Sequence, residues 1–156
     1  MRLLLLAASN RQPDWVVAGY REYAGRLRGR FVLELKEVKL ARRTGGASVA
    51  QAVADEGERL LAAVPDGAHV VALSERGAPW STADLAARLE RWSALGAPVC
   101  LLLGGPDGLA PRCLERAAEQ WCLSPLTLPH GLARIIVAEA LYRAWSLLER
   151  HPYHRA

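Results

Sequence analysis

Cysteine is scarce in this chain of 156 residues, and long apolar runs are missing. The three cysteines, Cys100, Cys113 and Cys122, are odd in number and form no Cys-x-x-Cys pair, which argues against a disulfide framework and against a zinc site. The four histidines lack the helical i, i+4 pairing of hydrolytic zinc enzymes. We therefore expect reduced core thiols and no metal.

No apolar run approaches the roughly 20 residues that are needed to span a bilayer. The start, MRLLLLAASN, turns polar too early for a secretory signal, so the cytoplasm is the expected location and no membrane partner is expected. The length and a hydrophobic content of 51% suit one domain with a real core, covering residues 1–156.

Positive charge is concentrated in one part of the chain. Residues 21–43 contain eight basic and three acidic side chains, a local net charge of +5 against +4 for the whole chain. Such a region can meet a polyanion, because neutralising phosphates supplies much of the affinity for nucleic acids. The alternative is an ordinary solvated surface in an arginine-rich protein.

Strand-like and helix-like segments alternate, which predicts an α/β fold with a mostly parallel sheet flanked by helices. The expected strands cover residues 3–7, 31–40, 70–73, 99–103 and 123–128. The expected helices start near Pro13, near Val49 and at a Ser81–Asp84 capping box, and two more cover 112–121 and 132–150. Residues 41–48, ARRTGGAS, read as a loop and a substrate contact.

The third, fourth and fifth expected strands end in turn residues, at 74–79, 104–111 and 129–131. Ligands of open parallel sheets bind outside the carboxyl ends of the strands, so three such loops indicate a small-molecule site. Each loop by itself could be an ordinary βα turn. The GGPDG stretch is neither GxxxxGK[ST] nor GxGxxG, which disfavours nucleoside triphosphates and conventional dinucleotides.

The last helix is apolar around most of its circumference, with Glu139, Arg143, Ser146 and Arg150 on a narrow polar stripe. A helix of this kind needs more partners than one sheet face offers, which favours a homodimer over burial within one subunit. Arg134, off this stripe in the first turn, is a candidate substrate or phosphate contact, or else a free surface arginine.

The chain ends in HPYHRA, where disorder is the default for a terminus. Yet an aromatic ring, two imidazoles and an arginine together can stack on a base, transfer a proton and bind an anion.

Several segments resemble one known family. LLLGGPDGL, LSPLTLPH, VAEALYRAWS and the ending HPYHR look like the ribosomal RNA large-subunit methyltransferase H family, a small branch of the SPOUT (α/β-knot) methyltransferases. The likeness covers nearly the whole chain and includes PDW near the start and DEGERLL in the middle.

The resemblance implies a C-terminal trefoil knot and a homodimer with active sites at the subunit interface. It also implies S-adenosylmethionine as methyl donor, and N3 of a pseudouridine in the 23S ribosomal RNA of assembled ribosomes as acceptor. The cofactor contacts carried over by motif are Leu73, Gly104, Leu123, Ser124, Pro125, Leu126, Thr127 and Leu128. Proline at 125 departs from the small residue expected there, and its nitrogen cannot donate a hydrogen bond.

Removing the proton from the acceptor nitrogen calls for a general base. We expect His154, delivered by the tail to the partner's pocket, to be that base, with Tyr153 stacking on the nucleobase. Arg155 and Arg134 are expected to hold phosphate or the uracil carbonyls.

Two other functions fit the same features. One is a SPOUT methyltransferase that acts on another RNA such as transfer RNA. The other is a non-catalytic ribosome-binding module, which the intact GGP and LSPLTL segments argue against.

Overall fold

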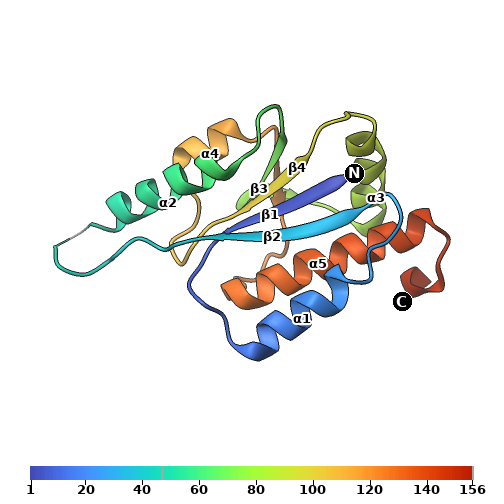
Figure 1. Ribbon diagram of the computed structural model, residues 1–156, viewed down its shortest axis with the longest axis horizontal. Helices are drawn as coiled ribbons and strands as arrows, with labels where there is room; N and C mark the ends of the chain where they lie inside the picture. Colours follow the sequence, from blue (N-terminus) through green and yellow to red (C-terminus); the bar gives the residue numbers. More distant parts are fainter. Residues whose placement is uncertain (47, 156) are drawn as a thin grey trace.

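The computed structural model describes residues 1–46 and 48–155, and its centre is one five-stranded sheet. All strand pairs are parallel, in the order β2-β1-β4-β3-β5 (Figure 1). The strands are β1 (Arg2–Ala8), β2 (Val32–Val38), β3 (His69–Pro79), β4 (Val99–Leu103) and β5 (Glu119–Cys122). The expected α/β fold with a parallel sheet is confirmed.

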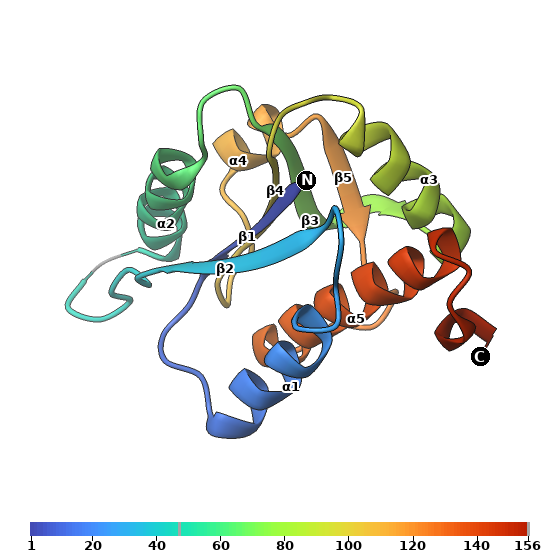
Figure 2. The ribbon, with the colours of Figure 1, turned by 45° about the vertical axis from the view of Figure 1, so that its right-hand side comes forward.

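Helices cover both faces of the sheet (Figure 2). Those on one face are α1 (Asp14–Ala24), α3 (Thr82–Ser93) and α5 (His130–Leu148), and those on the other are α2 (Val49–Ala63) and α4 (Pro111–Arg116). A short 3₁₀ turn, η1 (Pro152–Arg155), follows α5 and packs against it. No helix in the described part of the chain is long and apolar enough to cross a bilayer.

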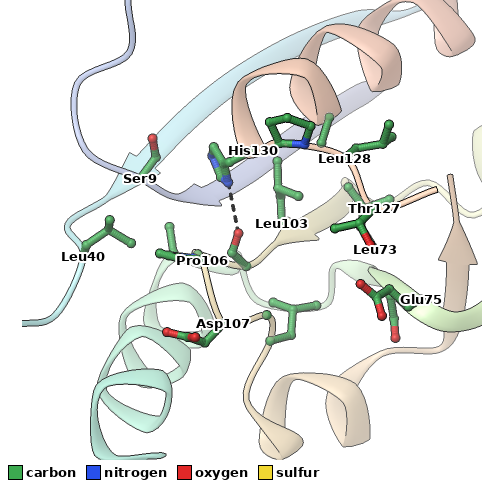
Figure 3. Close-up of a pocket in the computed structure, with 18 of the residues that line it drawn as sticks. Ser9, Leu40, Leu73, Glu75, Leu103, Pro106, Asp107, Thr127, Leu128 and His130 are labelled. Carbon is green, nitrogen blue, oxygen red and sulfur yellow. Dashed lines mark hydrogen bonds between the residues drawn. The ribbon is translucent and has the colours of Figure 1, made fainter. Parts of the chain in front are cut away.

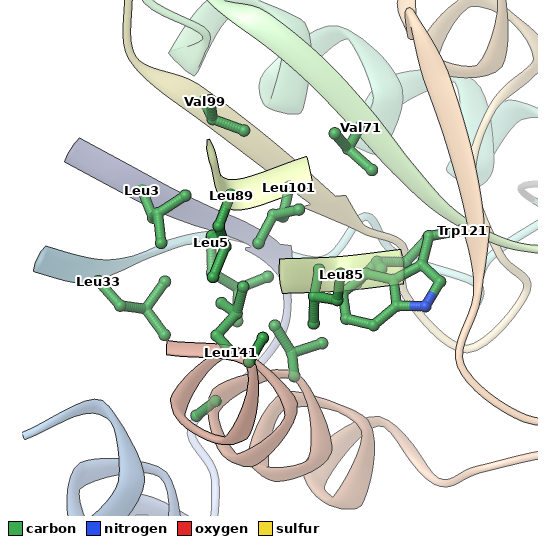
Figure 4. Close-up of a cluster of buried hydrophobic side chains, with 14 of the residues drawn as sticks. Leu3, Leu5, Leu33, Val71, Leu85, Leu89, Val99, Leu101, Trp121 and Leu141 are labelled. Atoms are coloured by element: carbon green, nitrogen blue, oxygen red, sulfur yellow. The ribbon is translucent and has the colours of Figure 1, made fainter. Parts of the chain in front are cut away.

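The strands alternate their side chains between two cores, as the two-residue period of a strand requires. In β1, Leu3 and Leu5 join the α1–α3–α5 core, whereas Leu4 and Leu6 join the α2–α4 core. Figure 4 shows the first core, where Leu101 and Leu141 lie between the sheet and α5. Cys100 and Cys113 are buried in the second core as free thiols.

Two strand assignments made from the sequence are wrong. Residues 74–79 are not a loop, because β3 continues to Pro79 with a bulge between Leu73 and Ala78. Gly77 lies within this extension, where a Cβ atom would come within 2.7 Å of the β5 backbone. The fifth strand is Glu119–Cys122, and residues 123–128 form a loop instead.

The helix predictions hold better. The Ser81–Asp84 capping box is present at α3, and Gly96 adopts a φ of 67° shortly after that helix ends. The expected helix 112–121 is shorter than predicted, because α4 ends at Arg116 and β5 follows. The trefoil knot concerns chain threading, which strand order and register do not establish, so it stays a prediction.

Helix α5 is packed within the subunit on several sides. It contacts α1 and α3 as well as the sheet-facing core. Ser146, expected on the polar stripe, is fully buried and donates to the Arg143 carbonyl. The apolar circumference of α5 is thus largely explained by one subunit, and it no longer requires a dimer.

Glu119, at the start of β5, fastens α3 to the sheet. Its carboxylate accepts hydrogen bonds from His69, Arg88 and Trp92, each at 2.8 Å. The Arg88 guanidinium also lies over the Trp80 ring, which stacks on Trp121. Burial alone would raise the pKa of Glu119, but these donors outweigh it and lower the pKa below its usual value of 4.5.

Replacing Glu119 with Gln should therefore lower the free energy of unfolding by roughly 2 kcal/mol at pH 7, because the bonds are to a charged acceptor. A lowered native pKa stabilises the fold above the unfolded pKa, and this stabilisation is lost as the pH falls through the native value. Urea unfolding should show the difference between wild type and Glu119→Gln shrinking below about pH 4.5. Glu115→Gln, at an exposed position, should have little effect at any pH. A pH-independent difference for Glu119→Gln would contradict this account.

Candidate active site

A cavity of about 1100 Å³ lies at the carboxyl edge of the sheet, where the sequence predicted a small-molecule site. The three predicted segments all contribute to its wall, with Ser74 to Arg76, Gly104 to Leu109 and Thr127 to His130 (Figure 3). The segments meet because β4, β3 and β5 are adjacent and parallel. Only the middle segment is a loop throughout, since the first lies within β3 and the last reaches His130, where α5 begins.

Four of the eight cofactor candidates line this cavity, namely Leu73, Gly104, Thr127 and Leu128. The other four do not line it and directly precede Thr127 and Leu128 in the loop after β5, namely Leu123, Ser124, Pro125 and Leu126. Ser124 shapes that loop, because its hydroxyl accepts a hydrogen bond from the Leu126 amide at 2.9 Å. Leu126 is left 75% exposed, at the edge of the site.

Sequence reasoning missed the contribution of the segment after β1. Ser9, Asn10 and Gln12 line the cavity, together with Leu40 after β2 and Glu75 in β3. Ligands of parallel sheets bind outside the carboxyl ends of the strands, and the carboxyl ends of β1 and β2 lie at the same edge as those of the later strands. That rule could have identified Ser9 and Leu40, whereas no sequence signal singles out Glu75.

The glycine loop after β4 is folded tightly on itself. A Cβ atom at Gly104 would lie 2.5 Å from the Gly108 carbonyl carbon and 2.7 Å from the Leu109 nitrogen. Gly108 has a φ of 84°, which residues with a side chain rarely adopt, and it pairs with Gly105. The bare backbone expected from the sequence is therefore required by the loop's own packing.

A buried carboxylate holds the arginine loop after β2 against the glycine loop. Glu56 of α2 is 2% exposed and accepts hydrogen bonds from the Ala41 amide and the Arg43 guanidinium, the latter at 2.6 and 3.0 Å. Arg43 also donates to Asp107 at 2.7 Å. These contacts clasp residues 41–43 to the rim of the cavity. The expected loop also includes Ala47, which lies outside the described residues.

Arg134 does not lie on the surface, so the reading of it as a free surface arginine is wrong. It is 1% exposed, and its guanidinium donates to Ser9 at 2.9 Å and to His130 at 3.0 Å, with Glu37 at 3.4 Å. It does not line the cavity. The expected direct contact with phosphate or a uracil carbonyl therefore does not fit this structure, because the charged group is enclosed by protein.

The tail is ordered against α5 rather than frayed. Tyr153 donates to Glu139 at 3.0 Å and packs against Tyr142 with a ring-centroid distance of 4.5 Å. Burial, with the hydrogen bond to Glu139, raises the pKa of Tyr153 to about 12. Tyr153 thus anchors the tail as a neutral phenol, and its expected stacking on a nucleobase stays a prediction.

The remaining tail residues are more accessible. His154 is half-buried, and its Nδ1 bonds to the His151 carbonyl, while Arg155 is exposed. Because a carbonyl only accepts, Nδ1 carries the proton and the neutral ring keeps a lone pair on Nε2. Nε2 is not used by this bond, and the role of His154 as a general base stays a prediction.

The tail and the cavity lie at opposite ends of α5. The helix begins at the cavity with His130 and ends at Leu148, and its 19 residues span about 28 Å. Within one subunit, the predicted catalytic residues Tyr153, His154 and Arg155 are not brought to the predicted cofactor residues.

The basic region divides between these two ends. Lys39 and Arg42 are exposed on the cavity side, after β2, whereas Arg28 and Arg30 precede β2 on the opposite side. Arg26 lies beside Tyr142, the ring on which Tyr153 of the tail packs, with its guanidinium 5.7 Å from the centre of the Tyr142 ring. Within residues 1–46 and 48–155, no cluster of three His, Cys, Asp or Glu side chains could hold a metal ion.

Comparisons with known proteins agree with this architecture. The sequence model of a family described as predicted SPOUT methyltransferase matches residues 1–154. The chain is 53% identical over 156 residues to the ribosomal RNA large subunit methyltransferase H of Alkalilimnicola ehrlichii, and the match covers all of both chains.

Among solved structures, TrmJ from Z. mobilis has a TM-score of 0.51 at 19% identity, over 92% of this chain and 70% of that one. This likeness shows a shared fold. The methyltransferase AviRb from Streptomyces viridochromogenes, solved with AdoMet, is more distant, with a TM-score of 0.44 at 15% identity over 92% of this chain and 57% of that one. The full-length family match is decisive, and the chain belongs to the SPOUT methyltransferases, which use S-adenosylmethionine.

Proposed function

We propose that this protein methylates the RNA of the large ribosomal subunit in the cytoplasm, with S-adenosylmethionine as donor. The observation that carries the proposal is a glycine-loop cavity at the carboxyl edge of the sheet in a chain 53% identical, end to end, to a relative named for that activity. The acceptor that we propose is N3 of a pseudouridine in 23S ribosomal RNA of assembled ribosomes. This acceptor rests on the family resemblance.

The cavity suits the chemistry of the donor. Leu73, Leu103 and Leu109 supply apolar wall for a purine ring, while Ser9 and Glu75 supply polar groups for a ribose or an amino acid moiety. Ligand pockets usually measure roughly 300–1,000 Å³, so this volume of about 1100 Å³ leaves room for a nucleobase beside the donor. The residues present therefore fit S-adenosylmethionine.

When bound, S-adenosylmethionine supplies an electrophilic methyl group on a positively charged sulfur. The protein's part is to hold the acceptor nitrogen in line with that methyl group, since positioning accounts for much of the acceleration of such displacements. A clasped glycine loop between adjacent strand ends is a rigid platform for this purpose. The Nε2 lone pair of His154 would accept the proton from N3, while the donor would supply the methyl group and keep the electron pair of the broken carbon–sulfur bond as S-adenosylhomocysteine.

The tail must then come from a second subunit. The tail packs on the second half of α5, and neither Tyr153, His154 nor Arg155 lines the cavity of its own subunit. A homodimer in which the two α5 helices lie head to tail brings the tail of each subunit to the cavity of its partner. In that arrangement Arg26, Arg28 and Arg30 also approach the partner's cavity, where they can contact RNA phosphates.

Binding of the donor is the first prediction of this proposal. Calorimetry with S-adenosylhomocysteine, the inert product, should show one saturable site per subunit. Gly104→Val should abolish that binding, because any side chain there displaces the Gly108–Leu109 backbone. Thr127→Trp, at an exposed position on the cavity rim, should also block the site and keeps the loop packing intact.

The acceptor is tested with the same proteins. Wild type should transfer radiolabelled methyl groups to assembled ribosomes lacking the modification, and the two blocked variants should not. Transfer to transfer RNA instead would identify a SPOUT methyltransferase of another RNA. A protein that binds ribosomes but neither donor nor product would be the non-catalytic module, and the proposed function would fall.

His154 carries the second prediction. His154→Ala should lower kcat at neutral pH by roughly 10²–10⁴-fold, the usual worth of a general base, without changing the affinity for S-adenosylhomocysteine. The residual rate should rise with pH as hydroxide replaces the missing base. His151→Ala is the matched control, because it removes a neighbouring imidazole but leaves the carbonyl that binds His154. If His154→Ala keeps the wild-type kcat, His154 is not the general base.

A further inference from the structure

A chain of hydrogen bonds leads from a buried arginine to the glycine loop of the cavity. The Arg134 guanidinium contacts His130 Nε2 at 3.0 Å, and His130 Nδ1 contacts the Gly104 carbonyl oxygen at 3.0 Å. The second bond is drawn in Figure 3, where His130 reaches from the start of α5 to the end of β4. His130 itself lines the cavity. The chain therefore joins the protein interior to a residue at which we expect the donor to bind.

The partners determine where the proton on His130 resides. Arginine has only donors, so Nε2 accepts, and a carbonyl has only acceptors, so Nδ1 donates. Both bonds can exist together only in the neutral ring with its proton on Nδ1. Burial lowers the pKa of His130, and the Arg134 charge lowers it further, whereas the Gly104 carbonyl and Glu37 act in the opposite direction.

Arg134 is held firmly enough to impose this choice. It is 1% exposed and also donates to Ser9, whose own amide binds the Val38 carbonyl. Its Nε has no partner among the described residues. Burying an arginine with an unsatisfied nitrogen costs stability, since the lost hydration is not fully replaced. This loss of stability occurs at the position where the guanidinium determines the tautomer of His130.

The Gly104–Gly105 peptide is the group that needs holding. Two consecutive glycines adopt many backbone conformations at little cost, so this peptide plane can rotate unless something fixes it. The peptide is planar, so a carbonyl held towards His130 turns the Gly105 amide in the opposite direction. The bond from His130 thus determines which backbone groups the glycine loop presents to a ligand.

We propose that His130 is a positioning residue, which fixes the Gly104–Gly105 peptide for donor binding, and that Arg134 acts through it by selecting its tautomer. This assignment rests on the proposed function in that the bound molecule is S-adenosylmethionine. It gives Arg134 a role inside the subunit in place of the direct contact with RNA that its position rules out.

Two substitutions at His130 separate this role from simple packing. The amide nitrogen of Asn falls near the position of Nδ1, so His130→Asn can still donate to the Gly104 carbonyl. The longer Gln places its amide near Nε2, so His130→Gln keeps a partner for Arg134 and loses the bond to Gly104. His69→Gln is the matched control, because His69 is hydrogen-bonded to Glu119 at the start of β3, away from the cavity.

Calorimetry with S-adenosylhomocysteine should show His130→Asn within about twofold of wild type. His130→Gln should bind roughly three- to tenfold more weakly, the worth of one hydrogen bond, and its KM for the donor should rise with little change in kcat. His69→Gln should leave the affinity unchanged and the thermal midpoint close to that of wild type, because its amide lies near the position of Nε2 and can still donate to Glu119. Equal affinities of wild type and His130→Gln would overturn the positioning role and leave the proposed function standing. No binding by wild type would overturn both.

The tautomer is open to direct measurement. Long-range ¹H–¹⁵N spectra of the wild-type protein near pH 7 should show His130 neutral, with its proton on Nδ1. Arg134→Met, which removes the donor to Nε2, should shift this histidine towards the other tautomer or a mixture. A proton on Nε2 in the wild type would contradict the assignment, because both observed bonds could then not form.

Discussion

Helix α5 separates the tail from the cavity, and the proposed shared site depends on this separation. Its 19 residues rise about 28 Å from the cavity, and the tail that follows packs back on its second half, where Tyr153 bonds to Glu139. The packing of α5 against α1, α3 and the sheet prevents it from bending to bring its ends together. Chemistry that needs both the glycine loop and His154 must therefore use two copies of the chain. The proposed dimer rests on the separation of the tail from the cavity and not on the apolarity of the helix.

The parallel sheet supplies the other half of the arrangement. Because β1, β4 and β3 run side by side in one direction, the segments that follow them converge on one cavity. Buried polar groups then fix those segments in relation to one another. Glu56 holds the arginine loop to the glycine loop, and Arg134 with His130 holds the glycine loop to α5. The short loops of the site are therefore held in place by the buried charged side chains of Glu56 and Arg134.

The sequence predicted the parts of the structure in which local pattern and burial agree. The all-apolar β4 was assigned correctly from Val99 to Leu103, because a strand covered on both faces reads as a continuous apolar run. The edge strand β5 was missed because Glu119 and Gln120 look polar, while the leucine-rich stretch after it is a loop at the cavity. Gly77 was read as a turn, although it allows β3 and β5 to approach closely.

The sequence predicted the location of the cavity but not the buried hydrogen bonds of Arg134 beside it. Glycine and proline after the strands located the cavity, since turn residues at strand ends are a local signal. The environment of Arg134 has no such signal, because its partners Ser9 and Glu37 are 125 and 97 residues away along the chain. Only the folded sheet brings them together. Long-range pairing of polar groups is what the sequence pattern could not supply.

The most direct test of the shared site uses mixed dimers. Gly104→Val subunits, with a blocked cavity and an intact tail, are co-expressed with His154→Ala subunits under two affinity tags, and the heterodimer is purified. Each parent homodimer should be inactive on ribosomes, whereas the heterodimer should recover about half of the wild-type kcat, because it holds one intact cavity facing one intact tail. A heterodimer as inactive as its parents would show that cavity and tail act within one subunit, and it would contradict the account.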